Sequence, residues 1–421
     1  MSMKIKKIVG SEIFDSRGIP TLEVALFLED GQHVTASVPS GLSRGSYEAA
    51  ELRDGGKRLF GFGLTKAIDM LDREIAPILI EKEPDVVVLD LEMIARDGTA
   101  DKSNLGANTM LAASIAVLKA QAAINGVEPY ELIARLCGVE SVTMPYPFFN
   151  VINGGVHADN RLHVQEFMVV PVNLPTFRAA MEAGVTLFHE LKEVLHSHGK
   201  STAVGDEGGF APECESEVEA FDYLMEAIER TKQHCSAHFV LAIDVAASQF
   251  YDAKIKKYEW YGAVLAADDL IGMYEQWVAQ YPIYSIEDGL GEHDTAGWHR
   301  MMKKIGENVQ LVGDDLFATN PERIFAGIEQ ELATAAIIKP NQIGTVTEAL
   351  QAITLCKEHG MNVIVSHRSG ETNDPFIADL ALGSNAGALK AGGCSRGERL
   401  AKYNHLLRIE DALVLSALNP T

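Results

Sequence analysis

Six short apolar runs in this chain each end on a residue that can carry charge. The terminal residues are Asp244, Glu287, Asp314, Lys339, His367 and Lys390. From the second to the last, the steps are 27, 25, 28 and 23 residues, close to one strand plus one helix. Chemistry at the ends of successive strands is typical of a barrel or a doubly wound sheet. The spacing therefore predicts an α/β fold with its site at one end of the strands.

Three successive members of this series are carboxylates, Asp244, Glu287 and Asp314. Oxygen ligands without cysteine or a regular histidine pair suit magnesium better than zinc. A single carboxylate at a strand end is explained more simply as the cap of the helix that follows. Three at matching strand ends favour a metal site.

Lys339 follows the apolar run TAAII and directly precedes Pro340. A lysine at the end of a buried strand is poorly explained as a surface charge. Burial and a nearby metal cation would both lower its pKa, which makes Lys339 a candidate general base. A structural ion pair with one of the carboxylates is the competing interpretation.

Two glutamates are candidates for a general acid. Glu207 lies in VGDEGGF, where glycines allow the backbone to approach a ligand closely, although an ordinary turn is the alternative. Glu166 lies in VQEF at the tip of a predicted strand, beside Gln165. The two glutamates could form a carboxylate pair in which one member stays protonated.

The run His367-Arg368-Ser369 predicts an anion-binding cradle, with Lys390 adding charge at the next strand end. A helix start with a serine cap is the alternative. Two glycine-rich loops, 39–45 and 153–157, could close over such a site, or could be ordinary turns. Neither loop matches the nucleotide-binding patterns.

Composition bounds the class of protein. The length of 421 residues predicts two domains, and the net charge of -23 gives a surface that repels nucleic acids and anionic membranes. Five scattered cysteines predict a reducing compartment. No apolar run approaches about 18 residues, and no apolar stretch follows the basic start, so we expect neither a membrane span nor a leader. These features predict a cytoplasmic protein.

Two domains are expected, at 1–130 and 138–421. Residues 3–40 alternate as an antiparallel meander, and 64–136 show helical periodicity, which together form an α+β unit. The second domain opens with PFFNVI and HVQEFMVVPV, whose connection is too short for a parallel crossover. These two strands should therefore pair antiparallel. Two helices are expected around 176–199, with strand and helix alternating after 202.

Taken together, these motifs resemble the enolase (phosphopyruvate hydratase) family from residue 8 to residue 412. The matching blocks are FDSRGIPTLEV, VPSGLSRG, NGGVHADN, QEFM, GDEGGFAP, LAIDVAAS, SIEDGL, GDDLFATNP, IIKPNQIGT, VSHRSGET, FIADLALG and SRGERLAKYN. The resemblance implies an N-terminal α+β capping domain. It also implies a C-terminal enolase-type (β/α)8-like barrel with an irregular ββαα start.

The resemblance further implies a hydro-lyase that converts 2-phospho-D-glycerate reversibly to phosphoenolpyruvate in glycolysis and gluconeogenesis. A lysine or histidine base working with magnesium on an enolate is the described pattern of the enolase superfamily. Lys339 would then be the base, and Glu207 with Glu166 the acid. Two Mg²⁺ per site are implied: the first held by Asp244, Glu287 and Asp314, and the second by Ser43. The implied substrate-binding residues are His157, Gln165, His367, Arg368, Ser369 and Lys390.

Two departures from the family pattern concern loops. Leu42 and Arg44 alter the first lid, and Ala391, Gly393 and Cys394 alter the segment after Lys390. They bear on lid closure and turnover more than on the identity of the reaction.

Other functions remain open at this point. A racemase or cycloisomerase of the same superfamily would show a K-x-K pair where this chain has Gln165-Glu166. A binding protein is a further alternative, since the family is reported to bind plasminogen at cell surfaces without a signal peptide, and to join RNA-degrading assemblies. The lysines of YDAKIKKYEW could serve such contacts, but a solvated hairpin explains them better. Family members form homodimers or octamers.

Overall fold

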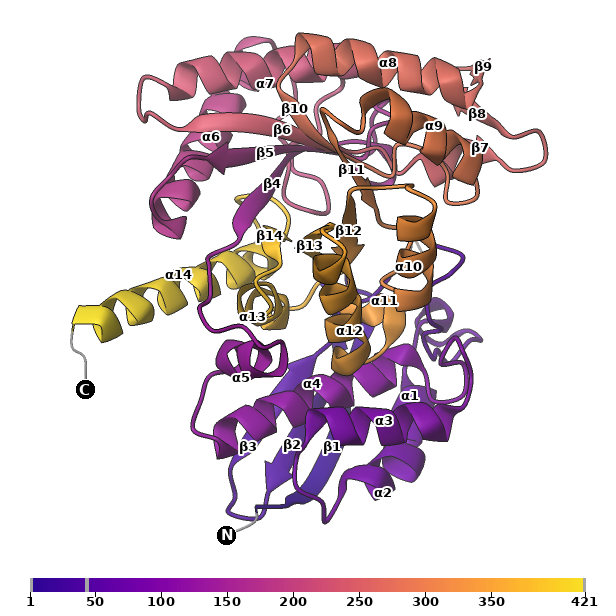
Figure 1. Cartoon of the computed structure of the whole chain (residues 1–421), viewed down its shortest axis with the longest axis vertical. Helices are drawn as coiled ribbons and strands as arrows, with labels where there is room; N and C mark the ends of the chain where they lie inside the picture. Colours follow the sequence, from indigo (N-terminus) through magenta and orange to yellow (C-terminus); the bar gives the residue numbers. More distant parts are fainter. Residues whose placement is uncertain (1–2, 42–44, 419–421) are drawn as a thin grey trace.

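A three-stranded antiparallel sheet opens the chain. The computed structural model describes residues 3–41 and 45–418. The strands are β1 (Ile5–Phe14), β2 (Pro20–Leu28) and β3 (His33–Ser37), paired in that order. Burial alternates along most of β2, because one face of the sheet packs on helices. The predicted meander is confirmed (Figure 1).

Helices cover that sheet. They are α1 (Thr65–Met70), α2 (Ala76–Leu79), α3 (Val86–Asp97), α4 (Ala107–Ile124) and α5 (Pro129–Leu136). The expected first helix is interrupted, since a π-helical turn, η2 (Leu71–Ile75), joins α1 to α2. A short 3-10 turn, η1 (Arg58–Gly61), precedes them. Strands followed by helices give the expected α+β unit.

α4 departs from one expectation. It is long and apolar enough to cross a membrane by length and composition, although no such span was predicted. However, 78% of it is buried inside the protein, against β2, β3, α3 and α5. We therefore interpret α4 as the core helix of the N-terminal unit.

A closed barrel follows, with the strand order β10-β11-β12-β13-β14-β4-β5-β6 among the described residues. Its strands are β4 (Tyr146–Asn153), β5 (Glu166–Val172), β6 (His238–Asp244), β10 (Ile283–Glu287), β11 (Gln310–Gly313), β12 (Ala335–Ile338), β13 (Asn362–Ser366) and β14 (Gly387–Lys390). β5 runs antiparallel to both neighbours, and the other neighbouring pairs are parallel. The predicted irregular ββαα start is confirmed.

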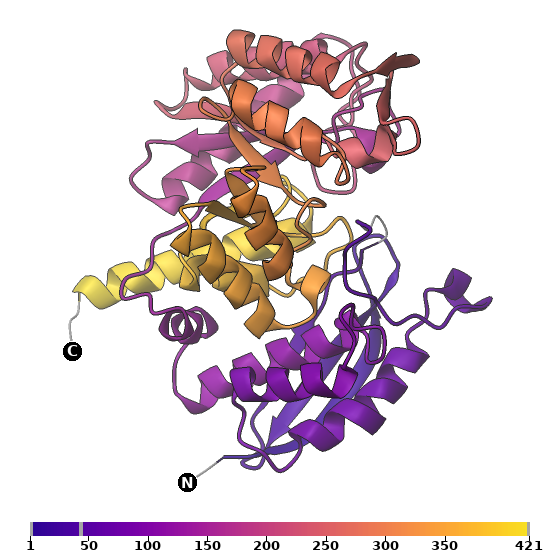
Figure 2. The ribbon, with the colours of Figure 1, turned by 45° about the vertical axis from the view of Figure 1, so that its right-hand side comes forward.

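Helices surround the barrel (Figures 1 and 2). They are α6 (Phe177–Ser197), α7 (Glu217–Thr231), α8 (Ala267–Gln280), α9 (Thr295–Ile305), α10 (Pro321–Glu329), α11 (Pro340–Ile343), α12 (Val346–Glu358), α13 (Phe376–Gly383) and α14 (Gly397–Leu418). One expectation was wrong, because residues 177–197 form a single helix. The second helix, α7, comes only after a loop that carries Glu207, so no strand follows residue 202 directly.

Smaller elements complete the chain. The lysine-rich segment forms the predicted hairpin within a small sheet of β7 (Tyr251–Asp252), β8 (Lys257–Trp260) and β9 (Ala263–Leu265). Two 3-10 turns are η3 (Gly155–His157) and η4 (Ala247–Phe250).

The barrel interior is filled by apolar side chains at alternate strand positions. Its cluster consists of Phe148, Met168, Val170, Ala242, Val312, Ala335, Ile337, Ile364 and Ala388. Because strand side chains alternate with period two, the residue two positions nearer the mouth also faces inward. Asp244 therefore faces inward above Ala242, Asp314 above Val312 and Lys339 above Ile337. The polar site is therefore the uppermost layer of the barrel core.

The N-terminal unit packs beside one side of the barrel. α3 and α4 contact α12, and α4 also contacts the short α11, which directly follows Lys339 (Figure 1). Buried Asp90 of α3 accepts hydrogen bonds from the backbone N–H and hydroxyl of Thr347 on α12. The capping unit is thus joined to the barrel near the candidate base.

Candidate active site

Strand ends meet at one mouth of the barrel. Glu166 pairs in register with Asp244, and Asp244 with Glu287, on adjacent strands. β5 is reversed, so its first residue lies where the neighbouring strands end. The pocket at this mouth is lined by most of the predicted site residues: His157, Gln165, Glu166, Glu207, Asp244, Asp314, Lys339, His367, Arg368, Ser369 and Lys390. Ser43 falls outside the described residues.

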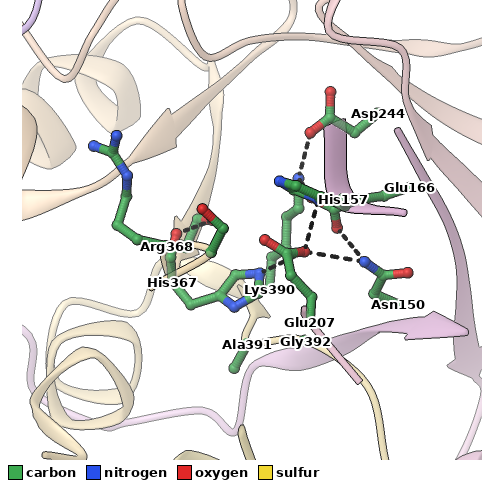
Figure 3. A network of polar contacts seen from close by, with 12 residues as sticks. Asn150, His157, Glu166, Glu207, Asp244, His367, Arg368, Lys390, Ala391 and Gly392 are labelled. Atoms are coloured by element: carbon green, nitrogen blue, oxygen red, sulfur yellow. Dashed lines mark hydrogen bonds and ion pairs between the residues drawn. The ribbon is translucent and has the colours of Figure 1, made fainter. Parts of the chain in front are cut away.

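Lys390 lies among four carboxylate oxygens at the base of the site. Its Nζ is 2.9 Å from Asp244 Oδ2 (Figure 3). It also lies 2.8 Å from Glu287 Oε2 and 3.1 Å from Glu166 Oε1. Burial opposes its charge, but these carboxylates outweigh burial and hold the pKa of Lys390 well above its usual range. The lysine is therefore a fixed cation on the floor of the pocket.

Lys339 forms an ion pair with Asp314, as the competing interpretation proposed. Gln342 donates to the other oxygen of Asp314 at 2.9 Å, so both partners are held in place. The expected fall in the lysine's pKa rested on burial together with a nearby metal cation, and the protein's own groups act in opposite directions. Burial favours the neutral amine, but the Asp314 carboxylate outweighs burial and raises the pKa of Lys339. The amine of Lys339 is therefore positioned as a base would be, and Asp314 favours its charged form.

Two glutamates form the predicted carboxylate pair. Asn150 of β4 donates its amide hydrogens to Glu166 Oε2 and to Glu207 Oε2, each at 3.0 Å (Figure 3). All three side chains are buried. Asn150 therefore holds two acids from separate segments against one another.

The two acids differ in charge. Burial and the neighbouring Glu207 raise the pKa of Glu166 well above its usual range. Burial would do the same to Glu207, but its contacts with His157 and His367, including a hydrogen-bonding contact with His367, and the charge of Arg399 outweigh burial and lower its pKa. A proton shared by the pair is therefore favoured on Glu166 over Glu207.

Two imidazoles face the same carboxylate. His157 Nδ1 and His367 Nε2 each lie 3.5 Å from Glu207 Oε2. Burial lowers the pKa of both rings, to about 4 for His367, so both are neutral at pH 7. Among the described residues neither of these nitrogens has a well-formed hydrogen bond. Unsatisfied polar atoms at this depth are expected where a ligand binds.

Glu207 lies on the loop between α6 and α7. Gly208 has φ +89, and a Cβ there would come 2.6 Å from the carbonyl oxygen of Ser395. Gly393 also donates to the carbonyl of Glu207 at 2.8 Å. Gly208 thus allows close approach to another loop of the chain, while close approach of a ligand stays a prediction. This packing fixes the acid in place.

Arg368 is the buried guanidinium of the predicted anion cradle. It makes a forked ion pair with Glu48, at 2.8 Å and 3.2 Å. Ser369 accepts a hydrogen bond from Arg17 Nη1 at 2.9 Å, and Arg17 also donates to the carbonyl of Ser40 at 3.2 Å. The cradle therefore draws on the N-terminal unit as well as on the barrel.

An acidic cluster beside Lys339 is compatible with a metal ion. Ligand oxygens of Asp288, Asp314 and Asp315 lie within 4.8 Å of one another. Asp288 accepts backbone N–H groups of the other two, which orients their loop. Burial and the charge of Asp314 raise the pKa of Asp315 to about 8. This surplus of buried negative charge fits a divalent cation.

The cluster overlaps the predicted ligand set only at Asp314. Asp244 and Glu287 lie on the neighbouring strands and contact Lys390 instead. Burial and the charges of Asp244 and Asp314 raise the pKa of Glu287, so the three predicted ligands are linked electrostatically. Among the described residues, however, their ligand oxygens do not form a group in which all atoms lie within 4.8 Å of one another.

Sequence reasoning missed several residues of this site. Asn150, Glu48, Arg17 and Arg399 all contact predicted site residues. Asn150 gave a usable signal, because an amide within the apolar run PFFNVI is unexpected in a buried strand. The other three residues lie in loops or at the start of a helix, far in sequence from the residues they contact. No hydrophobic periodicity indicates there which side chain reaches the site.

Comparison with known proteins agrees with this geometry. The family model of the N-terminal domain of enolase matches residues 5–133, and that of the enolase C-terminal TIM barrel domain matches residues 141–419. The chain is 49% identical over 414 residues to an enolase of Natranaerobius thermophilus, covering 98% of this chain and 96% of the relative. It is 48% identical to an enolase of Anaplasma marginale, covering 99% of this chain and 96% of the relative.

The chain belongs to the enolase family. Enolases are hydro-lyases of glycolysis, and the chain has this function, with a metal-binding site at the barrel mouth.

Proposed function

We propose that the chain converts 2-phospho-D-glycerate reversibly to phosphoenolpyruvate with Lys339 as general base and the Glu207–Glu166 pair as general acid. One observation carries the assignment. In the closed order of eight strands, β12 and β5 are four places apart and therefore lie on opposite walls. Lys339 directly follows β12 and Glu166 begins β5. Groups on opposite walls suit removal of a proton and a hydroxyl from opposite faces of one substrate.

The base acts at C2 of the substrate. Nζ of Lys339, held by Asp314 and backed by Gln342, would take the proton next to the carboxylate. Proximity in a buried pocket replaces the search for a base in water, which is a large part of such a rate enhancement.

The acid acts at C3. The Glu207–Glu166 pair would supply the proton that the leaving hydroxyl needs to depart as water, because the raised pKa of Glu166 favours a protonated carboxyl there. Asn150 keeps the pair together, while His157 and His367 flank Glu207 at 3.5 Å. In the reverse direction the same pair would take the proton from water.

Substrate anions bind to the cations of the site. Arg368 and Ser369 would hold the phosphate and Lys390 the carboxylate, with contacts from Gln165, His157 and His367. The charge of -23 on the whole chain does not oppose this, because Lys390, Lys339 and Arg368 all line the pocket.

Two Mg²⁺ ions are the proposed cofactors, the first held by Asp244, Glu287 and Asp314 and the second by Ser43. When bound, they supply positive charge that stabilises the second negative charge on the substrate carboxylate and offsets the effect of Asp314 on the pKa of Lys339.

Separating the two half-reactions tests the roles. We expect Lys339→Ala to lose both phosphoenolpyruvate formation and exchange of the C2 hydrogen with deuterated water. Glu207→Gln should lose phosphoenolpyruvate formation and keep the exchange. Exposed Lys303→Ala serves as control and should behave as wild type. Exchange that persists in Lys339→Ala would exclude this lysine as the base.

Further properties are proposed from the family alone. We propose domains at 1–130 and 138–421, a cytoplasmic location and a homodimer or octamer. Secondary binding of plasminogen or of an RNA-degrading assembly, at the cell surface or after secretion without a signal peptide, is a separate proposal. Size-exclusion chromatography with light scattering tests the oligomer.

A further inference from the structure

Arg399 is a fully buried arginine at the start of α14, outside the residues assigned so far. Its guanidinium donates to the backbone carbonyls of Arg368 and Ser369, each at 2.6 Å, and of Asp206 at 3.0 Å. It thereby joins the loop of the acid to the loop of the anion cradle.

The same guanidinium contacts an imidazole. Nη1 of Arg399 lies 2.6 Å from Nδ1 of His367. A guanidinium keeps all its protons in proteins and has no acceptor, so the hydrogen bond can run in one direction alone. Nδ1 must accept, and it therefore carries no hydrogen. A neutral ring with that constraint has its hydrogen on Nε2.

That Nε2 points at the acid. It lies 3.5 Å from Oε2 of Glu207, and among the described residues it lacks a well-formed hydrogen bond. The charged groups that act on the ring are Glu207, Arg399 and Glu371. Two of these are anions, yet the ring stays neutral, chiefly because it is buried and also because Arg399 places a cation beside Nδ1.

We propose that Arg399 is a positioning residue that fixes His367 as the neutral tautomer with its hydrogen on Nε2. The single hydrogen on Nε2 is then donated to Glu207, or to the departing hydroxyl oxygen once substrate is bound, and His367 is prevented from acting as a base that competes for the acid's proton. The role at the hydroxyl rests on the proposed function of Glu207, while the tautomer itself does not.

Nuclear magnetic resonance of the full, ligand-free chain labelled with ¹⁵N-histidine tests the tautomer directly. The signal of His367 is assigned by its loss in His367→Gln. We expect the Nε2–H tautomer from pH 6 to pH 8.5, without titration. A hydrogen on Nδ1, or protonation of this ring near pH 6.5, overturns the proposal. Because this measurement needs no turnover, it is independent of whether the proposed catalytic roles hold.

Substitution of the arginine separates positioning from packing. Arg399→Met keeps the length of the side chain and removes every donor, so His367 should become a mixture of tautomers and kcat should fall by roughly 10²-fold. Arg399→Lys keeps a charged donor group without an acceptor and should restore the Nε2–H tautomer together with part of kcat. If the tautomer is unchanged in a folded Arg399→Met, the proposal is wrong.

Amide replacements of the histidine give a second test. Glutamine places its amide nitrogen near the position of Nε2, whereas asparagine reaches only the position of Nδ1. His367→Gln should therefore retain at least about ten times the kcat of His367→Asn, because it alone keeps a donor toward Glu207. Equal activities, or a more active asparagine variant, would contradict a donor role.

Discussion

Asn150 carries no charge, yet its amide sets the distance between the two acids of the site. Each amide hydrogen is donated to a different glutamate, at 3.0 Å. The residue occupies the inward position two residues after Phe148, in the top layer of the barrel core. A short, neutral donor is suited to this place, because a cation would bind one acid and a third carboxylate would repel both.

Replacing Asn150 by alanine tests this role at the level of one side chain. We expect kcat to fall by roughly 10²-fold, because the pair loses its common donor and its shared proton is no longer oriented. The free energy of unfolding should fall by about 1 to 3 kcal/mol, since the acids lose a buried partner. Steady-state kinetics and urea unfolding measure the two effects. Asn362→Ala, at the opposite end of the barrel, is the control; equal kcat in both variants would refute the role.

Residue types predicted much of the site and little of its electrostatics. Asp314, Lys339 and Lys390 could be placed from strand ends alone, because strand length fixes which residue reaches the mouth. Their charge states could not. Burial acts to lower the pKa of Lys339, as the sequence predicted, but the contact with Asp314 outweighs burial and raises that pKa. Such balances depend on distances that appear only when the strands are closed into a barrel.

At the scale of elements, the loop that carries Glu207 is held by packing against residues 393–395. Gly208 has no space for a Cβ, whereas a Cβ added to Gly199, which has φ +69 in the same connection, would meet nothing within 4 Å. The two glycines therefore share a positive φ, which would strain any other residue, and differ in their neighbours.

This contrast gives a matched pair of variants. Gly208→Ala should displace the acid and lower kcat by at least about 10²-fold, with a loss of about 1 to 3 kcal/mol in unfolding free energy. Gly199→Ala should show a loss of about 1 kcal/mol from strain and normal kcat. Turnover assays and thermal unfolding distinguish them. Normal turnover in Gly208→Ala would mean that the contact with Ser395 does not position Glu207.

The ion pair between Glu48 and Arg368 links the N-terminal unit to the anion cradle. Glu48 holds the donors of Arg368 that a phosphate group would use. We expect Glu48→Gln to bind inorganic phosphate more tightly, on the order of tenfold, because the anion no longer competes with a carboxylate. Isothermal titration calorimetry measures this affinity, with exposed Glu29→Gln as control. Weaker binding in Glu48→Gln would show that the carboxylate supports the cradle instead.

Strand direction was predictable from connection length, and helix number was not. The short link between PFFNVI and HVQEFMVVPV required antiparallel pairing, which the structure has. The sequence predicts two helices around 176–199, where the structure has the single 21-residue helix α6. Gly208 in the stretch that follows packs against the loop at Ser395, a contact that the sequence alone does not reveal.

For the whole molecule, Asp90 makes the junction between the two units sensitive to pH. Burial raises the pKa of Asp90 to about 6, against hydrogen bonds from Thr347 and Ser114. Its folded form binds more protons than the unfolded chain between about pH 4 and pH 6. The stability that the protonated form contributes is complete below this window and is lost as pH rises through 6.

Asp90→Asn should remove that dependence. The amide keeps an acceptor for Thr347 and Ser114 and carries no charge at any pH. Between pH 5 and pH 8, the unfolding free energy of wild type should fall by about 1 kcal/mol more than that of the variant. Urea unfolding at both pH values measures the difference, with exposed Asp30→Asn as control. Parallel pH profiles for wild type and Asp90→Asn would show that Asp90 does not titrate there.

The reversed direction of β5 also determines that the number of helices between β5 and β6 is even. β5 begins at the mouth and ends at the opposite end, where β6 must also begin. Helices that travel the length of the barrel between them must then come in an even number, because each one crosses from end to end. α6 and α7 are that pair, and their turning point lies at the mouth. One reversal therefore gives the mouth an additional loop, and that loop carries Glu207.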